Sequence, residues 1–343
     1  MGLTLKSPLE PMEALLVDEI PQGDCWQYEP KWDGFRCIVF RDGGTVLLQS
    51  KSGQPLARYF PDLVEVFKQF RAKQFVLDGE IVIPIKGRLS FDDLLMRIHP
   101  AASRVRKLAN EHPAMFVAFD LLATVRGASL LGLPLETRRE RLEAFCSKYL
   151  TKQHAVRLSP ATRDIKTANK WFKAVGGNLD GIVAKRLDLA YQSGTRNGMQ
   201  KIKRHRTADC VVGGFRYAEG KQVVGSLLLG LYDADGLLGH VGFTSAFKAS
   251  DREKITKLLE PLISGPGFTG RAPGGPSRWS TRRTDQWQPL KPKLVVEVDY
   301  DHFTGGRFRH GVKLLRWRPD KPPKSCTLDQ VVRKAGATLK LLD

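Results

Sequence analysis

The stretch Glu29-Pro30-Lys31-Trp32-Asp33-Gly34-Phe35-Arg36 holds the pattern from which the rest of this 343-residue chain is understood. It places one lysine just before an apolar strand predicted from Phe35 to Phe40. A lysine becomes a nucleophile only after losing the proton that it normally holds up to a pKa of about 10.4. Burial by Trp32, with positive charge from Arg36 and a bound metal, would lower that pKa. The stretch therefore predicts a reactive lysine, although Asp-Gly before a strand is more often an ordinary turn.

The net charge of +19 is the most unusual property of the composition. Basic residues are spread from Lys51 to Lys340 rather than gathered in one tail. A surplus of this size indicates a polyanionic partner, and a nucleic-acid backbone is the usual one. A basic, solvated surface without such a partner is the alternative.

The five cysteines are widely spaced and never form a C-x-x-C pair. This predicts free thiols in a reducing compartment and argues against a zinc site or a disulfide framework. The N-terminal region carries only the short apolar run Ala14-Leu15-Leu16-Val17, and no stretch approaches the ~20 apolar residues of a membrane span. We therefore expect a cytoplasmic protein that does not enter a membrane.

Residues 1–206 are predicted to form an α+β domain that begins with an extended arm over residues 1–28. Asp42-Gly43-Gly44 predicts a hairpin turn between two strands. Apolar spacing or a capping box predicts helices over 60–71, from Ser90, around 142–149 and over 164–175. Further strands are expected over 75–84, 115–122, 180–186 and 199–206.

Residues 207–343 are predicted to form a second domain of short strands with one helix over 249–263. The strands are expected over 210–217, 223–232, 237–241, 293–300 and 314–318. A Gly/Pro-rich loop follows the helix over 264–280. Several short strands with one helix indicate a small β-barrel of the oligonucleotide-binding type.

Acids and lysines recur at the starts and ends of the predicted strands. The acids able to hold a hard cation are Asp33, Glu80, Asp120 and Asp180. Lys201 and Lys203 point to the same side of one strand. Two neighbouring ammonium groups repel each other, so an anion between them is expected, while a solvated strand edge is the alternative.

Several common nucleotide and hydrolase motifs are absent from the sequence. Gly220-Lys221 is followed by Gln222 and lacks the upstream glycine of a Walker A loop. The chain has no dinucleotide glycine fingerprint, no H-E-x-x-H and no G-x-S-x-G. Any nucleotide chemistry must use a different arrangement.

Six motifs, in order and spacing from about residue 10 to 325, resemble ATP-dependent DNA ligases of the covalent nucleotidyltransferase superfamily, in their compact bacterial form. The resemblance implies a nucleotidyltransferase domain with ATP-grasp-like antiparallel sheets and helices, followed by an OB-fold barrel. It implies ATP as co-substrate and Mg²⁺, with Mn²⁺ as a substitute. Lys31 would be the nucleophile, and Glu29 and Arg36 would contact adenine and ribose. Ser50-Lys51-Ser52-Gly53 is similar to a nucleotide-contacting motif in which arginine usually stands at the position of Lys51.

The remaining motifs carry the other site residues that the resemblance implies. Glu80 in Leu77-Asp78-Gly79-Glu80 would bind ribose and metal, with Asp33 and Asp180 as further metal contacts. Phe119 would stack on adenine, although burial alone favours a core aromatic there. Asp180 replaces the commoner glutamate, and its shorter side chain favours contact through water. The phosphate and nucleotide contacts would come from Lys185, Lys201 and Lys203.

The last motif, Arg316-Trp317-Arg318-Pro319-Asp320-Lys321, matches the residues that orient the leaving pyrophosphate. Those residues would be Arg318, Asp320 and Lys321, with Arg318 and Lys321 also contacting the nucleotide. Lys313 stands where an arginine is frequent, which weakens bidentate phosphate contact. The second domain would have to close over the nucleotide and reopen for DNA.

The resemblance implies that the substrate is nicked duplex DNA, bound largely through its phosphates. A monomer is expected. Repair or end-joining proteins are expected as partners, because compact ligases lack the domain that encircles DNA in larger relatives. RNA ligation or mRNA capping uses the same lysine chemistry and is the nearest alternative. A non-catalytic nucleic-acid-binding module would have lost Lys31, Glu80, Lys201 or Lys203, all of which are present.

Overall fold

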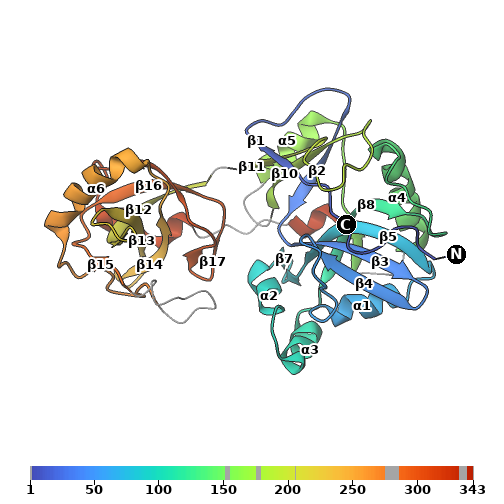
Figure 1. The fold of residues 1–343 in the computed structure, drawn as a ribbon, viewed down its shortest axis with the longest axis horizontal. Coiled ribbons are helices and arrows are strands. Elements are labelled where there is room, and N and C mark those ends of the chain that lie inside the picture. The colour runs from blue at the N-terminus through green and yellow to red at the C-terminus, as the bar shows by residue number, and fades with distance from the viewer. Residues whose placement is uncertain are drawn as a thin grey trace. The chain divides into compact units, whose positions relative to one another are not determined.

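The computed structural model describes residues 2–150, 155–174, 179–204, 206–274, 286–331 and 338–342 (Figure 1). The chain divides into two compact units. Unit 1 comprises Met1–Arg204 and Lys334–Asp343, and unit 2 comprises His205–Arg333. The division falls close to the expected one at residues 206 and 207, but Lys334–Asp343 groups with unit 1 although we expected it in the second domain.

The larger sheet of unit 1 has the strand order β4-β3-β5-β8-β9. Its strands are β3 (Phe35–Asp42), β4 (Thr45–Ser50), β5 (Gln74–Val82), β8 (Met115–Ala123) and β9 (Val156–Leu158). The pairs are antiparallel except for β8 with β9. The turn between β3 and β4 lies at the predicted Gly43-Gly44, and the ladder between β5 and β8 shifts register between Asp78 and Gly79.

The helices beside this sheet are α1 (Pro61–Lys68), α2 (Phe91–Met96), α3 (Ala102–Glu111) and α4 (Leu135–Tyr149). Helices α1 and α4 pack against its strands, α2 adds Leu94 to the main core of unit 1, and α3 packs on α1 (Figure 1). Ser90 caps α2 by accepting a hydrogen bond from the Asp93 amide, as the capping box predicts. The aromatic side chains of Phe60, Phe67 and Phe70 are buried in the core, as expected from their spacing. The sequence did not predict α3.

The smaller sheet of unit 1 has the order β1-β11-β10-β2. Its strands are β1 (Leu15–Val17), β2 (Trp26–Trp32), β10 (Leu179–Arg186) and β11 (Met199–Lys203), and α5 (Ile165–Ala174) packs on it. The region expected as an extended arm, residues 1–28, thus also supplies a strand of this sheet, β1, and the start of another, β2. The short hairpin β6 (Pro84–Ile85) and β7 (Arg88–Leu89) lies outside both sheets.

The 3-10 helix η6 (Thr338–Leu341) returns to unit 1. Leu341 and Leu342 pack against a small cluster that contains the buried Trp32, next to Lys31 in sequence. Residues near the C-terminal end of the sequence thus contribute to the core beside β2, the strand that carries Lys31.

Unit 2 is built on one curved sheet with the order β14-β13-β12-β16-β19, and β15 pairs with β12. The strands are β12 (Arg206–Tyr217), β13 (Val224–Tyr232), β14 (Leu238–Thr244), β15 (Gln288–Pro289), β16 (Val295–Tyr300) and β19 (Lys313–Trp317). Register shifts interrupt three of the antiparallel ladders, which is how such sheets curl. Among the described residues the ladder does not close, although a bridge joins Ala246 and Lys313 near its two ends. The fold is consistent with an OB-fold.

The helical part of unit 2 begins with η1 (Ala249–Asp251) and continues through α6 (Arg252–Leu259) into η2 (Glu260–Leu262), where one helix was predicted. The hairpin β17 (Phe303–Thr304) and β18 (Arg307–Phe308) lies beside the sheet, and η4 (Pro323–Ser325) and η5 (Leu328–Gln330) follow it. The predicted loop over 264–280 lies within the described residues only as far as residue 274.

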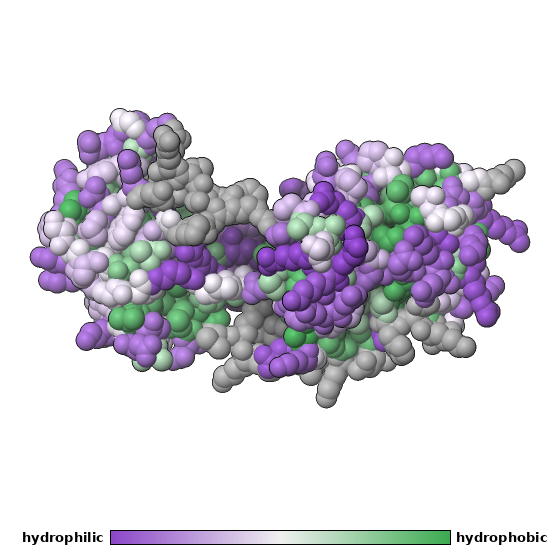
Figure 2. Space-filling model, turned by 90° about the horizontal axis from the view of Figure 1, so that it is seen from below, coloured by the Kyte–Doolittle hydropathy of each residue, from purple (hydrophilic) through white to green (hydrophobic). Residues whose placement is uncertain are grey.

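All five cysteines are free, as predicted. In the described ranges, no helix is long and apolar enough to cross a membrane. Figure 2 shows hydrophilic residues over much of the visible face of each unit, with smaller apolar areas between them.

Candidate nucleotide site

Most of the singled-out residues gather around one pocket of about 200 Å³ in unit 1. Both sheets contribute to its lining, which includes Glu29, Lys31, Arg36, Lys51, Glu80, Phe119, Lys185 and Lys201. A further wall is formed by the arm residues Pro11–Ala14. No motif predicted that wall.

Lys31 lies near the end of β2, where β2 pairs with β10 and Lys31 is opposite Gly181. This pairing brings Asp180 to the lysine, with 2.5 Å between Lys31 Nζ and Asp180 Oδ2. Asp180 also pairs with Lys203, whose Nζ lies 3.2 Å from the same oxygen. A side chain at Gly181 would collide with the Ile202 carbonyl, so the close approach of the two strands requires glycine.

The protein groups around Lys31 do not by themselves produce the lowered pKa that was predicted for burial, Arg36 and a bound metal acting together. Burial by itself would lower the pKa of Lys31, but the charge and hydrogen bond of Asp180 outweigh it, and Glu80 and Asp33 add to them. The pKa of Lys31 is therefore raised rather than lowered. Acids, and not cations, dominate around the amine, so activation requires that their charge be neutralised.

Glu80 stands on β5 among these groups. Burial raises the pKa of Glu80 to about 7, although the charges of Lys31 and Arg36 act in the opposite direction. A carboxyl group in this position is stabilised as an anion when further positive charge is bound nearby. Glu80 is thus suited to receive a cation.

The acids near Lys31 fit a magnesium ion of the kind that nucleotide enzymes use. Within the described ranges, no group of three His, Cys, Asp or Glu side chains is placed to hold a metal. Mg²⁺, however, is commonly held by one or two carboxylates together with substrate phosphates and water. Glu80 and Asp180 provide such a pair. Asp120 does not, because both of its oxygens accept hydrogen bonds from Arg138, at 2.9 and 3.0 Å.

Phe119 forms an aromatic surface in the pocket. The guanidinium of Arg36 lies 4.5 Å from its ring centroid and the Lys185 amine 4.4 Å. Lys185 is held in turn by Glu29, at 2.8 Å, and both are almost completely buried. Two cations, each with its own carboxylate partner, thus lie close to the ring.

Arg36 makes a bidentate pair with Asp78, with both nitrogen-to-oxygen distances at 2.6 Å. Asp78 is fully buried and also accepts a hydrogen bond from the Tyr191 hydroxyl. We did not predict Tyr191 or the pairing role of Asp78. The contacts join residues 42 and 113 positions apart, so no local sequence pattern marks them.

Positive charge also gathers at the pocket around Lys201. Burial, followed by the charges of Lys31 and Lys203, lowers the pKa of Lys201. Lys51 is exposed and pairs with Glu13 of the arm at 2.9 Å. The crowding around Lys201 agrees with the expectation that an anion binds there.

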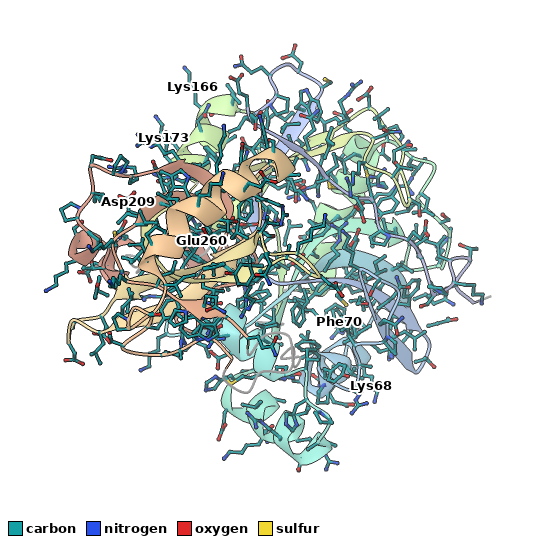
Figure 3. All side chains as sticks on the ribbon, turned by 60° about the vertical axis from the view of Figure 1, so that its left-hand side comes forward. Lys68, Phe70, Lys166, Lys173, Asp209 and Glu260 are labelled. Carbon is teal, nitrogen blue, oxygen red and sulfur yellow. The ribbon has the colours of Figure 1, made fainter. Side chains whose placement is uncertain are left out.

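Arg318, Asp320 and Lys321 lie in unit 2 and do not line the pocket. Asp209, labelled in Figure 3, binds both cations: its carboxylate lies 2.9 Å from Arg318 Nη1 and 3.2 Å from Lys321 Nζ. Asp320 pairs with Arg318 at the surface. The sequence analysis missed Asp209, which precedes a buried strand segment and gave no motif signal.

The chain matches two known protein-family models. The family described as ATP dependent DNA ligase domain matches residues 10–203, and the ATP dependent DNA ligase C terminal region matches residues 220–321. The chain belongs to the ATP-dependent DNA ligases. This ligase is therefore an enzyme that uses ATP as its co-substrate, and the family expected from its motifs is confirmed.

Individual relatives agree with this assignment. The ligase is 46% identical over 343 residues to DNA ligase C1 of Mycolicibacterium smegmatis, covering 96% of each chain. It is 31% identical over 308 residues to the multifunctional non-homologous end joining protein LigD of Mycobacterium bovis, covering 87% of this ligase but 37% of that protein. A solved structure titled as a structure-function analysis of Lig E DNA ligases has a TM-score of 0.54 and 16% identity, covers 90% of this ligase and is itself covered completely, and shares its fold.

Proposed function

We propose that this ligase seals nicks between a 5′-phosphate and a 3′-hydroxyl in duplex DNA, with Lys31 as the nucleophile that carries AMP. One observation carries this proposal: Lys31 lines the pocket that also contains the Phe119 ring and the cation Lys201. A base-stacking surface and a phosphate-attracting cation then flank the amine. That arrangement suits attack on the α-phosphate of ATP.

In the first step the Lys31 amine attacks the α-phosphorus, a P–N bond forms, and the bond to the pyrophosphate oxygen breaks. The 5′-phosphate at the nick then attacks the same phosphorus and releases the lysine. Finally the 3′-hydroxyl attacks the activated 5′-phosphorus and AMP leaves.

Each pocket residue has a proposed part in the first step. Phe119 stacks on adenine, Glu29 and Arg36 contact adenine and ribose, and Lys185 contacts the nucleotide while it holds Glu29. Lys201, Lys203 and Lys51 attract phosphates. Glu80 and Asp180 would hold Mg²⁺ or Mn²⁺, with Asp33 nearby, and this ion supplies the positive charge that offsets the acids around Lys31.

We propose the parts of the chain as a nucleotidyltransferase domain over 1–206 and an OB-fold domain over 207–333, with η6 docked on the first. Arg318, Asp320 and Lys321 are proposed to orient the leaving pyrophosphate, with Arg318 and Lys321 contacting the nucleotide. The net charge of +19 supports binding through DNA phosphates. The similarity to an end-joining protein supports a role in DNA repair with partner proteins.

The test is transfer of a label from α-labelled ATP in the presence of Mg²⁺. Wild type should take up label and lose it while sealing a nicked DNA duplex, whereas Lys31→Ala should show only background label. Lys68→Ala is the matched control, because Lys68 is an exposed lysine on α1 that pairs with Glu65 (Figure 3).

The alternatives give distinct results in the same assay. Label that leaves only onto a nicked duplex with a broken RNA strand would replace DNA sealing by RNA ligation. Equal label on wild type and Lys31→Ala would show that another residue is the nucleophile.

A further inference from the structure

We infer that Tyr191 is a positioning residue for ATP binding, whose hydroxyl fixes the N-terminal arm and the Arg36–Asp78 pair relative to each other. The inference rests on the proposed function, because it assigns Tyr191 through Arg36. The hydroxyl donates to Asp78 Oδ2 at 2.6 Å and accepts from the Met12 amide at 2.9 Å. One oxygen atom thus joins a wall of the pocket to the carboxylate that orients its arginine.

The geometry leaves little freedom at this junction. Asp78 is fully buried, and Tyr191 and Met12 are about as buried as core residues. Both oxygens of Asp78 accept hydrogen bonds from Arg36, and Tyr191 shares one of them. Burial, followed by the charge of Asp78, raises the pKa of Tyr191, so its hydroxyl keeps the proton that it donates.

The arm is held at several neighbouring points by the loop that carries Tyr191. Ser193 Oγ donates to the Glu10 carbonyl at 2.6 Å, and the Glu13 amide donates to the Thr195 carbonyl at 2.8 Å. The contact made by Tyr191 continues from Asp78 to Arg36 and on to the face of Phe119, and Arg36 also donates to the Met12 carbonyl at 3.4 Å. Loss of the hydroxyl should therefore loosen the guanidinium and the arm wall together.

The consequence is specific to nucleotide binding. Arg36 is proposed to contact the nucleotide and the arm lines the pocket, so their displacement should weaken ATP binding and leave bond making at Lys31 nearly unchanged. A residue that only packed the core would lower the amount of folded enzyme without changing the KM for ATP.

The test compares Tyr191→Phe with Tyr28→Phe in the full chain. Tyr28 is the matched control, because it is also a buried tyrosine whose hydroxyl donates one hydrogen bond, to the Pro21 carbonyl at 2.7 Å, but it does not line the pocket. In self-adenylation, Tyr191→Phe should raise the KM for ATP about tenfold, as loss of a hydrogen bond to a charged group implies, while saturating ATP restores the maximal rate. Tyr28→Phe should leave the KM unchanged.

Hydrogen exchange of the Met12 and Glu13 amides provides a second readout. These amides should exchange faster in Tyr191→Phe, and not in Tyr28→Phe. An unchanged KM in Tyr191→Phe, or an equal rise in both variants, would overturn the inference. If wild type takes up no label, the proposed function fails, and the exchange of the arm amides then decides the inference alone.

Discussion

Two buried sites, one in each unit of this ligase, hold ionisable groups in different ways. Around the pocket of unit 1 they form close opposite-charge pairs, which are Arg36 with Asp78, Lys185 with Glu29 and Arg138 with Asp120. In unit 2, His240 is buried near arginines rather than against an acid. Burial, followed by the charges of Arg307, Arg216 and Arg271, lowers the pKa of His240 to about 3.

The two arrangements differ because the buried groups have different roles. A buried pair costs desolvation energy but fixes both side chains, which suits a pocket that must present a guanidinium and an amine to a nucleotide. A neutral buried histidine costs less than a charged one, and its burial becomes much costlier when it is protonated. Unit 1 should thus be sensitive to loss of a partner, and unit 2 to acid.

The largest effect is expected when a buried pair in unit 1 is broken. Glu29→Gln leaves the Lys185 ammonium buried without a carboxylate, which should destabilise unit 1 by about 3–5 kcal/mol. The measurement is denaturant-dependent hydrogen exchange of the β2 and β10 amides. The double variant Glu29→Gln/Lys185→Met should recover most of the loss.

The matched control for Glu29→Gln is a substitution at the surface of unit 2. Asp320→Asn removes one of the partners of Arg318, an exposed carboxylate, and should leave stability unchanged. A similar loss in Asp320→Asn and Glu29→Gln would remove the contrast between the units.

The acid sensitivity of unit 2 is the next effect in size. Because the folded pKa of His240 lies below the ordinary 6.5, the unfolded chain takes up the proton first as the pH falls. The stability of unit 2 should be highest above pH ~6.5 and fall by up to about 1.4 kcal/mol per pH unit below it. His240→Gln should flatten this slope, as measured by hydrogen exchange of β13 and β14 at pH 5 and 7.

The control for the acid effect is an exposed histidine. His310→Asn changes a side chain that is 66% exposed and should retain the acid slope. If His240→Gln and wild type lose stability in parallel, protonation of another group is responsible.

The smallest effect concerns the cations of unit 2. Asp209→Asn releases Arg318 and Lys321 from their shared carboxylate and should slow self-adenylation about tenfold to a hundredfold, since misplaced groups are costly in catalysis. Rates at saturating ATP would measure it. Glu297→Gln is the comparison, because Glu297 lies 3.7 Å from Arg318 but bonds Arg316 at 2.6 Å, and it should have a smaller effect. Equal rates in wild type, Asp209→Asn and Glu297→Gln would show that Arg318 takes no part in self-adenylation.

Much of the fold was predictable because its signals are local. Strand β3 and its turn follow from the apolar run Phe35 to Phe40 and from Gly43-Gly44, and α2 follows from Ser90 and Asp93. Helix α3 was missed because its buried face consists only of Val105 and Ala109, which leaves too weak an apolar pattern.

The site was predictable in its residues but not in its electrostatics. Motif order identified Lys31, Glu80 and Lys201, which the fold brings to one pocket. The raised pKa of Lys31 depends on the pairing of β2 with β10, which places Asp180 beside it from a distant part of the chain. Tyr191 was not predicted for the same reason, because its hydroxyl bonds the Met12 amide, 179 positions away in the sequence.

The return of η6 to unit 1 has a consequence for synthesis on the ribosome. Leu341 and Leu342, which pack on the cluster around Trp32, are translated only after all of unit 2. Unit 1 can therefore begin to fold early but completes this part of its packing after unit 2 has emerged. A chain that is interrupted after the last ligase motif would lack the side chains of Leu341 and Leu342, and the apolar surface of this cluster beside β7 would be more open to chaperones and proteases.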